Sequence, residues 1–467
     1  MIFRQVIHDD LGCASYLIGD QRAGVAAVVD PRFEIDDYLD LARYLSVRIE
    51  HVLETHTHAD HVSGHGRLAA ATGARLHVHR AAGADYDHEP IEDGWTLALG
   101  RVLVRALHTP GHRPEHTAYE LVDTSRGQEP WAVLTGDTIF VGDVARPDLA
   151  ADPRDGAREM FRSLQRRLLS LPPETEIWPA HVGGSLCGGG GIDMKVSSTI
   201  GYERKHNPLL AVRDEETFVR RATEGLPPQP PNFRRIVGIN KGPLVTESFE
   251  PPPLTPTQVE RRLAAGALAV DVRHDVQFDD AHVPGALNLS MLRSGFGTKL
   301  AWVVDPDAEI VLIGRHDEDC RQAARLAAAV GMRAAGGYLA GGMSSWREER
   351  RPIERTERVP AEDLLTRCTR DPQVQILDVR EEAEWRAGHI PGSIHVPYHD
   401  LRDVPAGLDP ERPIAVICAS GMRSGVGASL AQRAGARRAI HVIDGGVGTW
   451  ERCGGPIERE EEIAAAA

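Results

Sequence analysis

A histidine-rich segment near the N-terminus carries the strongest chemical signal in the chain. Residues 55–61 read THTHADH and directly follow an apolar run typical of a strand. Further histidine or aspartate side chains come just after later apolar runs, in TPGH (109–112), TGD (135–137) and PAH (179–181). Imidazole and carboxylate groups at the ends of several strands can converge on one point, and both groups suit Zn or Fe(II). A metal held there could activate water or O₂. The candidate ligands are His56, His58, Asp60, His61, His112, Asp137 and His181.

A second candidate site lies near the C-terminus, where the apolar run PIAVI (413–417) is followed by CASGMRSG (418–425). A cysteine at the end of a strand, followed by a glycine-containing loop and a helix, is surrounded by backbone N–H groups and the positive end of the helix dipole. Both favour the thiolate, which is the nucleophilic form. Arg423 adds positive charge at the end of the loop. A buried cysteine without a role explains this whole pattern poorly.

The C-terminal part of the chain contains an internal repeat of about a hundred residues, which is a normal size for one α/β domain. Three short motifs occur twice in the same order, so chance matching is a poor explanation. The matching segments are VDVR (270–273) with LDVR (377–380), AHVPGALNL (281–289) with GHIPGSIHV (388–396), and GGMSSW (341–346) with GGVGTW (445–450).

The first copy of the repeat lacks the candidate nucleophile. Gly314 and Cys418 stand equally far before the matching glycines Gly331 and Gly435, so Gly314 takes the place of the cysteine. Cys320 falls opposite Ser424 instead, and the preceding HDED segment is acidic and would repel a sulfur anion. We therefore predict that the first copy is catalytically inactive and serves as a spacer or docking surface.

Apolar runs that alternate with helical segments predict an α/β fold with several domains. We expect a metal domain at residues 1–245, a proline-rich linker at 246–257, an inactive repeat at 258–352 and an active repeat at 356–460.

The HxHxDH pattern with its later histidine and aspartate residues resembles the metallo-β-lactamase superfamily, over residues 1–245. The resemblance implies a four-layer αββα sandwich with the metal site at one edge. Members similar to glyoxalase II hold two metals. In this sequence His56, His58 and His112 would bind the first metal, Asp60, His61 and His181 the second, and Asp137 would bridge them.

Persulfide dioxygenases keep a similar motif, and the resemblance to them implies one Fe(II) per chain, held by His56, His112 and Asp137. The other candidates would then lie around the metal or bind a second metal. They are His58, Asp60, His61 and His181. Such a ligand set leaves positions open for O₂ and a substrate sulfur. Zn(II) is the alternative ion.

Two segments favour the dioxygenase over the hydrolase. GDTIFVGDVARPDL (136–149) resembles a dioxygenase segment in which an arginine lies near the substrate, which implies a substrate-binding role for Arg146. The other interpretation of Arg146 is a surface arginine in an ion pair. FRRIVGINKGP (233–243) resembles the end of dioxygenase domains that are fused to sulfur-transfer domains. Such fusions oxidise low-molecular-weight thiol persulfides to sulfite and thiol.

The repeat resembles the rhodanese family, most clearly over residues 356–460, which implies a parallel-sheet α/β fold and a persulfide on Cys418. The six-residue loop from Cys418 to Arg423 is typical of sulfur carriers, whereas the related cysteine phosphatases have longer loops. The remaining residues of the predicted substrate loop are Ala419, Ser420, Gly421, Met422 and Ser424. The expected small-molecule partners are a persulfide, thiosulfate and a thiol of low molecular weight.

The other cysteines give weaker signals. Cys187 lies in a glycine-rich segment shortly after His181, so a thiol role near the metal and a turn cysteine without a role both stay open. Cys13, Cys368 and Cys453 are expected to be packing residues. The cysteine spacing gives no disulfide framework, which favours reduced thiols.

The composition argues against some classes of partner. The chain has 53 Lys and Arg against 68 Asp and Glu, a net charge of -15, which disfavours nucleic acid and anionic membranes. We see no signal peptide and no run long enough to cross a bilayer, so we expect a cytoplasmic protein. A homodimer is the expected assembly. A rhodanese pair that senses or docks sulfur carriers without catalysis is a further hypothesis.

Overall fold

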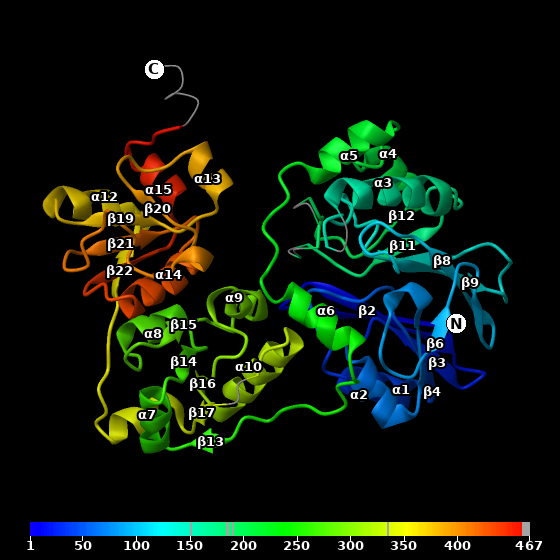
Figure 1. The fold of residues 1–467 in the computed structure, drawn as a ribbon, viewed down its shortest axis with the longest axis horizontal. Coiled ribbons are helices and arrows are strands. Elements are labelled where there is room, and N and C mark those ends of the chain that lie inside the picture. The colour runs from blue at the N-terminus through cyan, green and yellow to red at the C-terminus, as the bar shows by residue number, and fades with distance from the viewer. Residues whose placement is uncertain (150–151, 184, 186, 189–190, 334–335, 460–467) are drawn as a thin grey trace. The chain divides into compact units, whose positions relative to one another are not determined.

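The computed structural model describes residues 1–149, 152–183, 185, 187–188, 191–333 and 336–459 (Figure 1). The chain divides into two compact units. The first comprises Met1–Ser248 with Ala328–Gly331, and the second comprises Phe249–Ala327 with Met332–Ala467.

The first unit contains two sheets of six strands, which pack face to face. One sheet contains β1 (Ile2–His8), β2 (Cys13–Asp20), β3 (Val25–Val29), β4 (Arg48–Leu53), β5 (Arg75–His79) and β6 (Glu89–Ile91), in that order. The other has the order β12 (Ser198–Thr199), β11 (Glu176–Pro179), β10 (Ala132–Gly136), β9 (Thr117–Asp123), β8 (Val102–His108) and β7 (Thr96–Leu99).

Strand β2 contributes side chains to two hydrophobic cores, one on each face of its sheet. Its side chains alternate between the two faces of its sheet, as the strand period of two requires. Tyr16 and Ile18 join the core between the sheets, whereas Leu17 joins the core under the outer helices. Both faces of the sheet are buried at this strand, so apolar residues follow one another along it and do not alternate with exposed polar residues.

Helices cover the outer face of each sheet and complete an αββα sandwich, as the resemblance implied. Tyr38, Ala42 and Leu68 pack on the first sheet, and Met160 and Phe218 pack on the second. The helices of this unit are α1 (Asp36–Leu45), α2 (His65–Thr72), α3 (Pro153–Ser163), α4 (Ile200–His206), α5 (Glu215–Thr223) and α6 (Phe233–Lys241), with the short turns η1 (Arg80–Ala82) and η2 (Leu164–Leu168).

The second unit contains two parallel sheets of five strands each, one from each copy of the sequence repeat. The first has the order β13 (Pro253–Leu254), β17 (Gly337–Leu339), β16 (Ile310–Ile313), β14 (Leu268–Asp271) and β15 (Leu287–Asn288). The second has the order β18 (Glu357–Pro360), β22 (Ala439–Ile443), β21 (Ile414–Ile417), β19 (Gln375–Asp378) and β20 (Ile394–His395). The two copies therefore share one strand order.

Helices alternate with these strands, which confirms the predicted α/β class of both repeats. In the first copy they are α7 (Pro256–Ala264), α8 (Asp275–Asp280), α9 (Phe296–Val303), α10 (Asp317–Ala329) and α11 (Gly342–Glu348). In the second they are α12 (Ala361–Arg370), α13 (Glu382–Ala387), the short turn η3 (Tyr398–Asp400), α14 (Met422–Arg433) and α15 (Val447–Arg452).

The segment predicted as a linker, 246–257, is partly structured. It contains the edge strand β13 and the first residues of α7. Proline is tolerated at both places, because neither an edge strand nor the first turn of a helix needs every backbone N–H group. The proline-rich composition therefore did not distinguish a linker from an edge strand.

One buried ion pair explains the repeated VDVR and LDVR motifs. In the second copy Arg380 Nη2 donates to Asp378 Oδ2 at 2.7 Å and to the Gly388 carbonyl at 2.8 Å. In the first copy Arg273 makes the same contact with Asp271. The arginine ties the end of β14 or β19 to the segment that carries the HVPG or HIPG motif.

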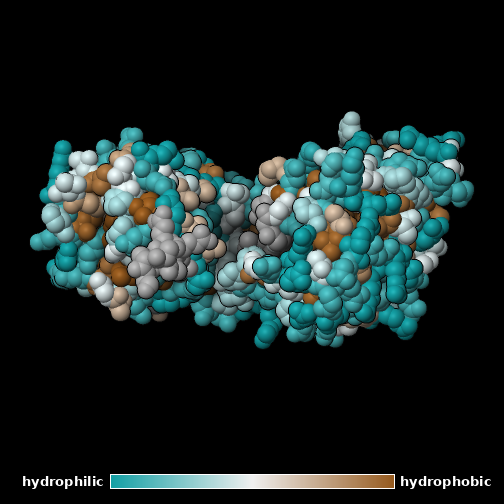
Figure 2. All heavy atoms as spheres, turned by 90° about the horizontal axis from the view of Figure 1, so that it is seen from above, coloured by the Kyte–Doolittle hydropathy of each residue, from teal (hydrophilic) through white to brown (hydrophobic). Residues whose placement is uncertain are grey.

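Polar side chains dominate the surface of each unit on the face shown in Figure 2, and hydrophobic side chains are scattered among them. This distribution agrees with the acidic composition. Among the described residues, no helix is both long enough and apolar enough to cross a membrane.

Replacing Arg380 with alanine should destabilise the second unit, because Asp378 would be left buried without its cation. We expect a loss of roughly 3–5 kcal/mol of unfolding free energy. The exposed Arg437 pairs with Glu411 and offers a matched control, for which Arg437→Ala should cost less than about 1 kcal/mol. Urea unfolding followed by tryptophan fluorescence measures both variants. Equal unfolding midpoints would contradict the prediction.

Candidate metal centre and sulfur-transfer loop

The three predicted iron ligands lie together in the first unit, because the strands that precede them end near one another. His56 follows β4, His112 follows β8, and Asp137 comes directly after β10. Asp137 Oδ2 lies 3.8 Å from His56 Nε2 and 3.4 Å from His112 Nε2. All three side chains are buried.

The atoms of these residues that face one another are also the ones without hydrogen bonds. His56 Nε2, His112 Nε2 and Asp137 Oδ2 are buried and have no hydrogen-bond partner among the described residues. Burying a polar atom without a partner is costly, so three such atoms at one point form a set that a cation would satisfy. Two imidazole nitrogens and one carboxylate oxygen suit Fe(II) or Zn. The residues present therefore fit a metal ion.

The other nitrogen of each histidine is fixed by a hydrogen bond. The Thr55 hydroxyl donates to Asp30 Oδ2 at 2.8 Å, so it must accept from His56 Nδ1, which lies 2.9 Å away. His112 Nδ1 donates to the Arg146 carbonyl at 2.9 Å. With the proton held on Nδ1, each Nε2 has a free lone pair for the ion.

His116, which the sequence analysis did not single out, positions the carboxylate ligand. The backbone N–H of Asp137 donates to His116 Nε2 at 2.9 Å. Burial, together with the neighbouring His112, lowers the pKa of His116 to about 3, which leaves Nε2 able to accept. Gly136 has φ +52°, and a Cβ there would lie 2.4 Å from His116 Nε2, so this turn requires glycine.

Three of the four remaining candidate ligands, Asp60, His61 and His181, lie within hydrogen-bond distance of one another or of Asp137. His181 Nδ1 lies 2.8 Å from Asp137 Oδ1, and its Nε2 lies 2.9 Å from Asp60 Oδ2. His61 Nδ1 lies 3.1 Å from Asp60 Oδ1. Although burial disfavours a charged ring, Asp137 and Asp60 hold the pKa of His181 well above its ordinary value. In this arrangement His181 acts as a bridge between two carboxylates.

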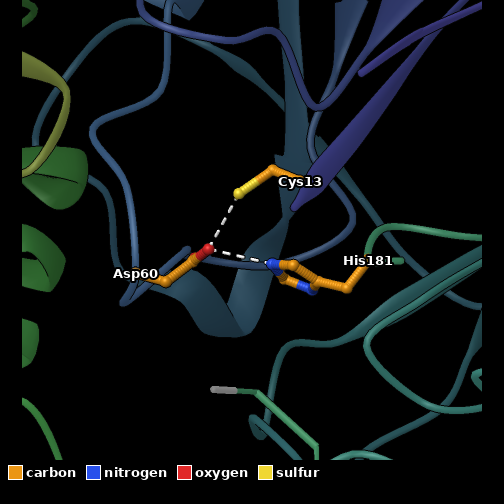
Figure 3. A group of neighbouring side chains, drawn as sticks. All are labelled: Cys13, Asp60 and His181. Atoms are coloured by element: carbon orange, nitrogen blue, oxygen red, sulfur yellow. Dashed lines mark hydrogen bonds and ion pairs between the residues drawn. The ribbon is translucent and has the colours of Figure 1, made fainter. Parts of the chain in front are cut away.

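Cys13 differs from the expectation that it is only a packing residue. Figure 3 shows Asp60 between Cys13 and His181, and the Cys13 thiol donates to Asp60 Oδ2 at 3.0 Å. Burial, reinforced by the charge of Asp60, raises the pKa of Cys13. The side chain is therefore a neutral hydrogen-bond donor at neutral pH. Its distance along the sequence from the histidine-rich segment hid this contact.

Cys187 lies close to the metal centre, where its sulfur is within 4.8 Å of ligand atoms of Asp137 and His181. Burial raises the pKa of its thiol to about 12. The loop around it is described only in part, because Gly184, Leu186, Gly189 and Gly190 lie outside the described residues. A thiol role for Cys187 stays a prediction.

His58 points toward two acidic residues that carry no motif in the sequence. Its Nε2 lies 3.2 Å from Asp30 Oδ1 and 3.2 Å from Glu54 Oε2. Despite the opposing effect of burial, these carboxylates raise the pKa of His58. Its Nδ1 is buried without a partner.

Arg146 is buried, in contrast to the surface arginine of the alternative interpretation. Its Nε donates to Asp148 Oδ1 at 2.7 Å and its Nη2 donates to the Pro227 carbonyl at 2.7 Å. Its own carbonyl accepts from the ligand His112. Arg146 thus holds the segment that orients a metal ligand, and its substrate-binding role stays a prediction.

In the second unit, Cys418 lies at the end of β21, and helix α14 begins at Met422. The Gly421 N–H donates to Cys418 Sγ at 3.1 Å, and Ser424 Oγ lies 3.5 Å from the sulfur. The side chain of Cys418 is fully buried. The Gly421 N–H and the N-terminus of α14 therefore lie beside the sulfur, whereas Ser424 Oγ accepts from it and donates to the Val442 carbonyl at 2.9 Å.

The other predicted loop residues occupy different positions. Ala419, Ser420 and Met422 are exposed, whereas Gly421 and Ser424 are buried. Arg423 pairs with Glu384 on α13, and its Nη2 donates to Glu384 Oε1 at 2.8 Å. Glu384, which carries no motif in the sequence, fixes the direction of Arg423.

In the first repeat, acidic side chains fill the equivalent loop. Gly314 stands at the end of β16 where the second repeat has its cysteine. The Asp317 carboxylate accepts the Gly341 N–H at 2.9 Å, and Asp319 pairs with Arg315. Cys320 is buried on α10, and burial raises the pKa of its thiol to about 12. The position of Cys418 is thus taken by a glycine in this repeat.

Comparison with known proteins assigns a family to each part of the chain. Residues 8–181 match the metallo-beta-lactamase superfamily, and residues 255–349 and 361–453 each match the rhodanese-like domain. A probable metallo-hydrolase of Burkholderia pseudomallei is 34% identical over 203 residues, which are 36% of this chain and 67% of that protein.

Two further relatives have different activities in their names. The mitochondrial persulfide dioxygenase of Bos taurus is 29% identical over 222 residues, which are 47% of this chain and 80% of that protein. The hydroxyacylglutathione hydrolase of Methylococcus capsulatus is 35% identical over 173 residues, which are 36% of this chain and 60% of that protein.

Among solved structures, a metallo-beta-lactamase from Staphylococcus aureus is similar with a TM-score of 0.67 and 29% identity. The likeness covers 73% of this chain and 99% of that one. The chain therefore belongs to the metallo-β-lactamase superfamily, whose fold binds metal ions. More particularly, it joins a domain of that superfamily to two rhodanese-like domains, one of which lacks the cysteine.

Gly446 packs so closely against the Cys418 backbone that it should not tolerate a side chain. A Cβ at Gly446 would lie 1.8 Å from the Cys418 carbonyl oxygen, whereas a Cβ at Gly448 would meet only the Arg452 side chain, at 3.6 Å. We expect Gly446→Ala to lower the thermal unfolding midpoint and slow alkylation of Cys418, and Gly448→Ala to leave both unchanged. Calorimetry and mass spectrometry after iodoacetamide treatment measure the two effects. Unchanged reactivity in Gly446→Ala would contradict the described loop.

Proposed function

We propose that the first unit is an iron-dependent persulfide dioxygenase and that the second is a sulfurtransferase acting through Cys418. The substrate would be a persulfide of a low-molecular-weight thiol, which O₂ and water convert to sulfite and free thiol. The observation that carries the proposal is the set of three unpartnered ligand atoms on His56, His112 and Asp137.

The hydrogen bonds around these atoms favour one metal over two. Asp60, His61 and His181 would be ligands of a second metal, but Asp60 already lies within hydrogen-bond distance of both histidines. Among the described residues, His61 Nε2 has no hydrogen-bond partner. A second metal would also need the Asp137 oxygen that accepts from His181. One ion at the unpartnered set leaves this network intact, which supports the ligand pattern of two histidines and one carboxylate.

Fe(II) held by His56, His112 and Asp137 would supply the redox chemistry that O₂ needs to react with a persulfide sulfur. The chain supplies the surroundings. His116 and His181 fix the orientation of the Asp137 carboxylate from two sides. Thr55 and the Arg146 carbonyl keep the proton of each histidine ligand on Nδ1. Because these side chains are buried, water is kept from the ligand atoms.

The second unit would handle sulfane sulfur. The Cys418 thiolate attacks the outer sulfur of thiosulfate, the sulfur–sulfur bond breaks, and sulfite leaves with the electron pair. The Gly421 N–H and the start of α14 stabilise the negative charge on the sulfur. An acceptor thiolate then takes the terminal sulfur, and the Cys418 thiolate is restored.

A two-zinc thioester hydrolase is the second candidate for the first unit. It is favoured by the presence of all seven ligands and by the names of two relatives, a metallo-hydrolase and a hydroxyacylglutathione hydrolase. The groups His58–Asp60–His61 and Cys13–Asp60–His181 each bring three ligand atoms within 4.8 Å. The number and kind of metal ions separate the two candidates.

Oxygen uptake by the iron-loaded full-length protein tests the proposal, with glutathione persulfide as substrate. We expect sulfite release at about one iron per chain, as a single two-histidine, one-carboxylate site requires. His112→Ala should abolish uptake and lose the metal, while His206→Ala, at the exposed end of α4, should keep both. Cys418→Ser should retain uptake and lose sulfur transfer.

A different set of results would contradict the dioxygenase proposal. Two zinc ions per chain, hydrolysis of S-lactoylglutathione and no oxygen uptake after iron loading would replace the dioxygenase by the hydrolase. Sulfur transfer through Cys418 is measured separately and does not depend on that outcome.

A further inference from the structure

A buried aspartate of the inactive repeat is linked to the nucleophile of the active repeat. Asp279 lies on α8 of the first copy, and Figure 1 shows α8 and β15 beside α14 of the second. Its Oδ2 lies 2.9 Å from His441 Nδ1 on β22. His441 Nε2 lies 2.8 Å from the Gly421 carbonyl, and the Gly421 N–H donates to Cys418 Sγ. One chain of hydrogen bonds thus runs from Asp279 to the sulfur.

Both hydrogen-bond partners of His441 are acceptors. A backbone carbonyl has no proton to give, and neither has a carboxylate. The ring satisfies both partners at once only when each nitrogen carries a proton, and Asp279 then supplies the balancing charge. His441 and Asp279 are both buried, so their interaction is weakly screened by solvent. Arg358 provides the other contact of Asp279, with its Nε at 3.1 Å.

The packing between the repeats is adapted to this contact. A Cβ at Gly425 on α14 would lie 3.0 Å from His441 Cε1 and 3.2 Å from Asn288 Nδ2, so glycine lets both side chains approach. The Asn288 N–H on β15 donates to Ser429 Oγ on α14 at 3.0 Å. The first repeat therefore packs directly against the helix that follows the Cys418 loop.

The first repeat has no histidine at the position equivalent to His441. His441 lies beside Val416 in its sheet, and the equivalent neighbour of Leu312 in the first repeat is Tyr338. Tyr338 contacts Arg321 of its own repeat through its hydroxyl group. Only the repeat with the cysteine has a histidine at this position, which associates His441 with the sulfur-transfer loop and not with the fold that the repeats share.

We propose that Asp279 is a positioning residue for sulfur transfer, so that the inactive repeat completes the active site of its neighbour. Asp279 holds His441 in the orientation and protonation that fix the Gly421 carbonyl and place positive charge behind the loop. Gly421 then keeps its N–H directed at the sulfur of Cys418. This inference rests on the proposed transfer of sulfur through Cys418.

Sulfur transfer by the full-length protein from thiosulfate to cyanide tests the inference, because it needs no knowledge of the natural acceptor. Cys418 takes the outer sulfur and releases sulfite, and cyanide then takes that sulfur as thiocyanate. In Asp279→Asn we expect kcat/KM for thiosulfate to fall about tenfold, the scale of one charge-assisted hydrogen bond. Asp280→Asn is the matched control, because Asp280 is the next residue on α8 and pairs with the exposed Arg347. It should behave like the unaltered protein.

A second measurement separates positioning from folding. The rate of Cys418 alkylation by iodoacetamide is followed against pH, together with the thermal unfolding midpoint. In Asp279→Asn the alkylation profile should move to higher pH, because His441 would no longer hold the Gly421 carbonyl in place and the Gly421 N–H would be less well directed at the sulfur. The unfolding midpoint should change little.

The possible outcomes are distinct. No thiocyanate from the unaltered protein would remove the proposed sulfur transfer itself. An active unaltered protein, with Asp279→Asn within twofold of it and an unshifted alkylation profile, would overturn the role of Asp279. Loss of activity with a lower midpoint and an unshifted profile would also overturn it, since Asp279 would then only stabilise the fold.

Discussion

Burying a carboxylate away from water is unfavourable unless donors or a cation surround it, and the first unit is built around that requirement at Asp137. One oxygen accepts from His181, and the other faces two imidazole nitrogens with no proton donor. Despite the cost of burial, His181 holds the pKa of Asp137 at about 2, so the group stays charged. The strand ends, the Gly136 turn and the contacts of His116 all act to keep this charge in place.

The same requirement distinguishes His181 from the candidate ligands His56 and His112. Sequence spacing treats His56, His112 and His181 alike, since each follows an apolar run. Their hydrogen-bond partners differ. His181 lies between two carboxylates, whereas His56 and His112 each have one ring nitrogen without a hydrogen-bond partner among the described residues. The difference between one metal and two therefore depends on the surroundings of the ligands and not on the motif.

The sequence predicted most of the architecture, because its signals are local. Apolar runs gave the strands, the repeated motifs gave two copies of one fold, and HxHxDH gave the metal domain. It did not predict His116, Glu384 or the contact of Cys13 with Asp60. These residues act through side-chain contacts between distant segments, and no spacing rule relates them. The proline-rich segment failed for another reason, since proline is compatible with both a linker and an edge strand.

The contact between Asp279 and His441 has a consequence for the history of the chain. A duplicated domain that loses its nucleophile is ordinarily free to drift or to be deleted. Here the silent copy holds a buried acid next to its neighbour's buried base. Deleting the copy would leave that base without its counterion, so a physical cost opposes its loss, although only one of the repeats has a cysteine at the position of Cys418.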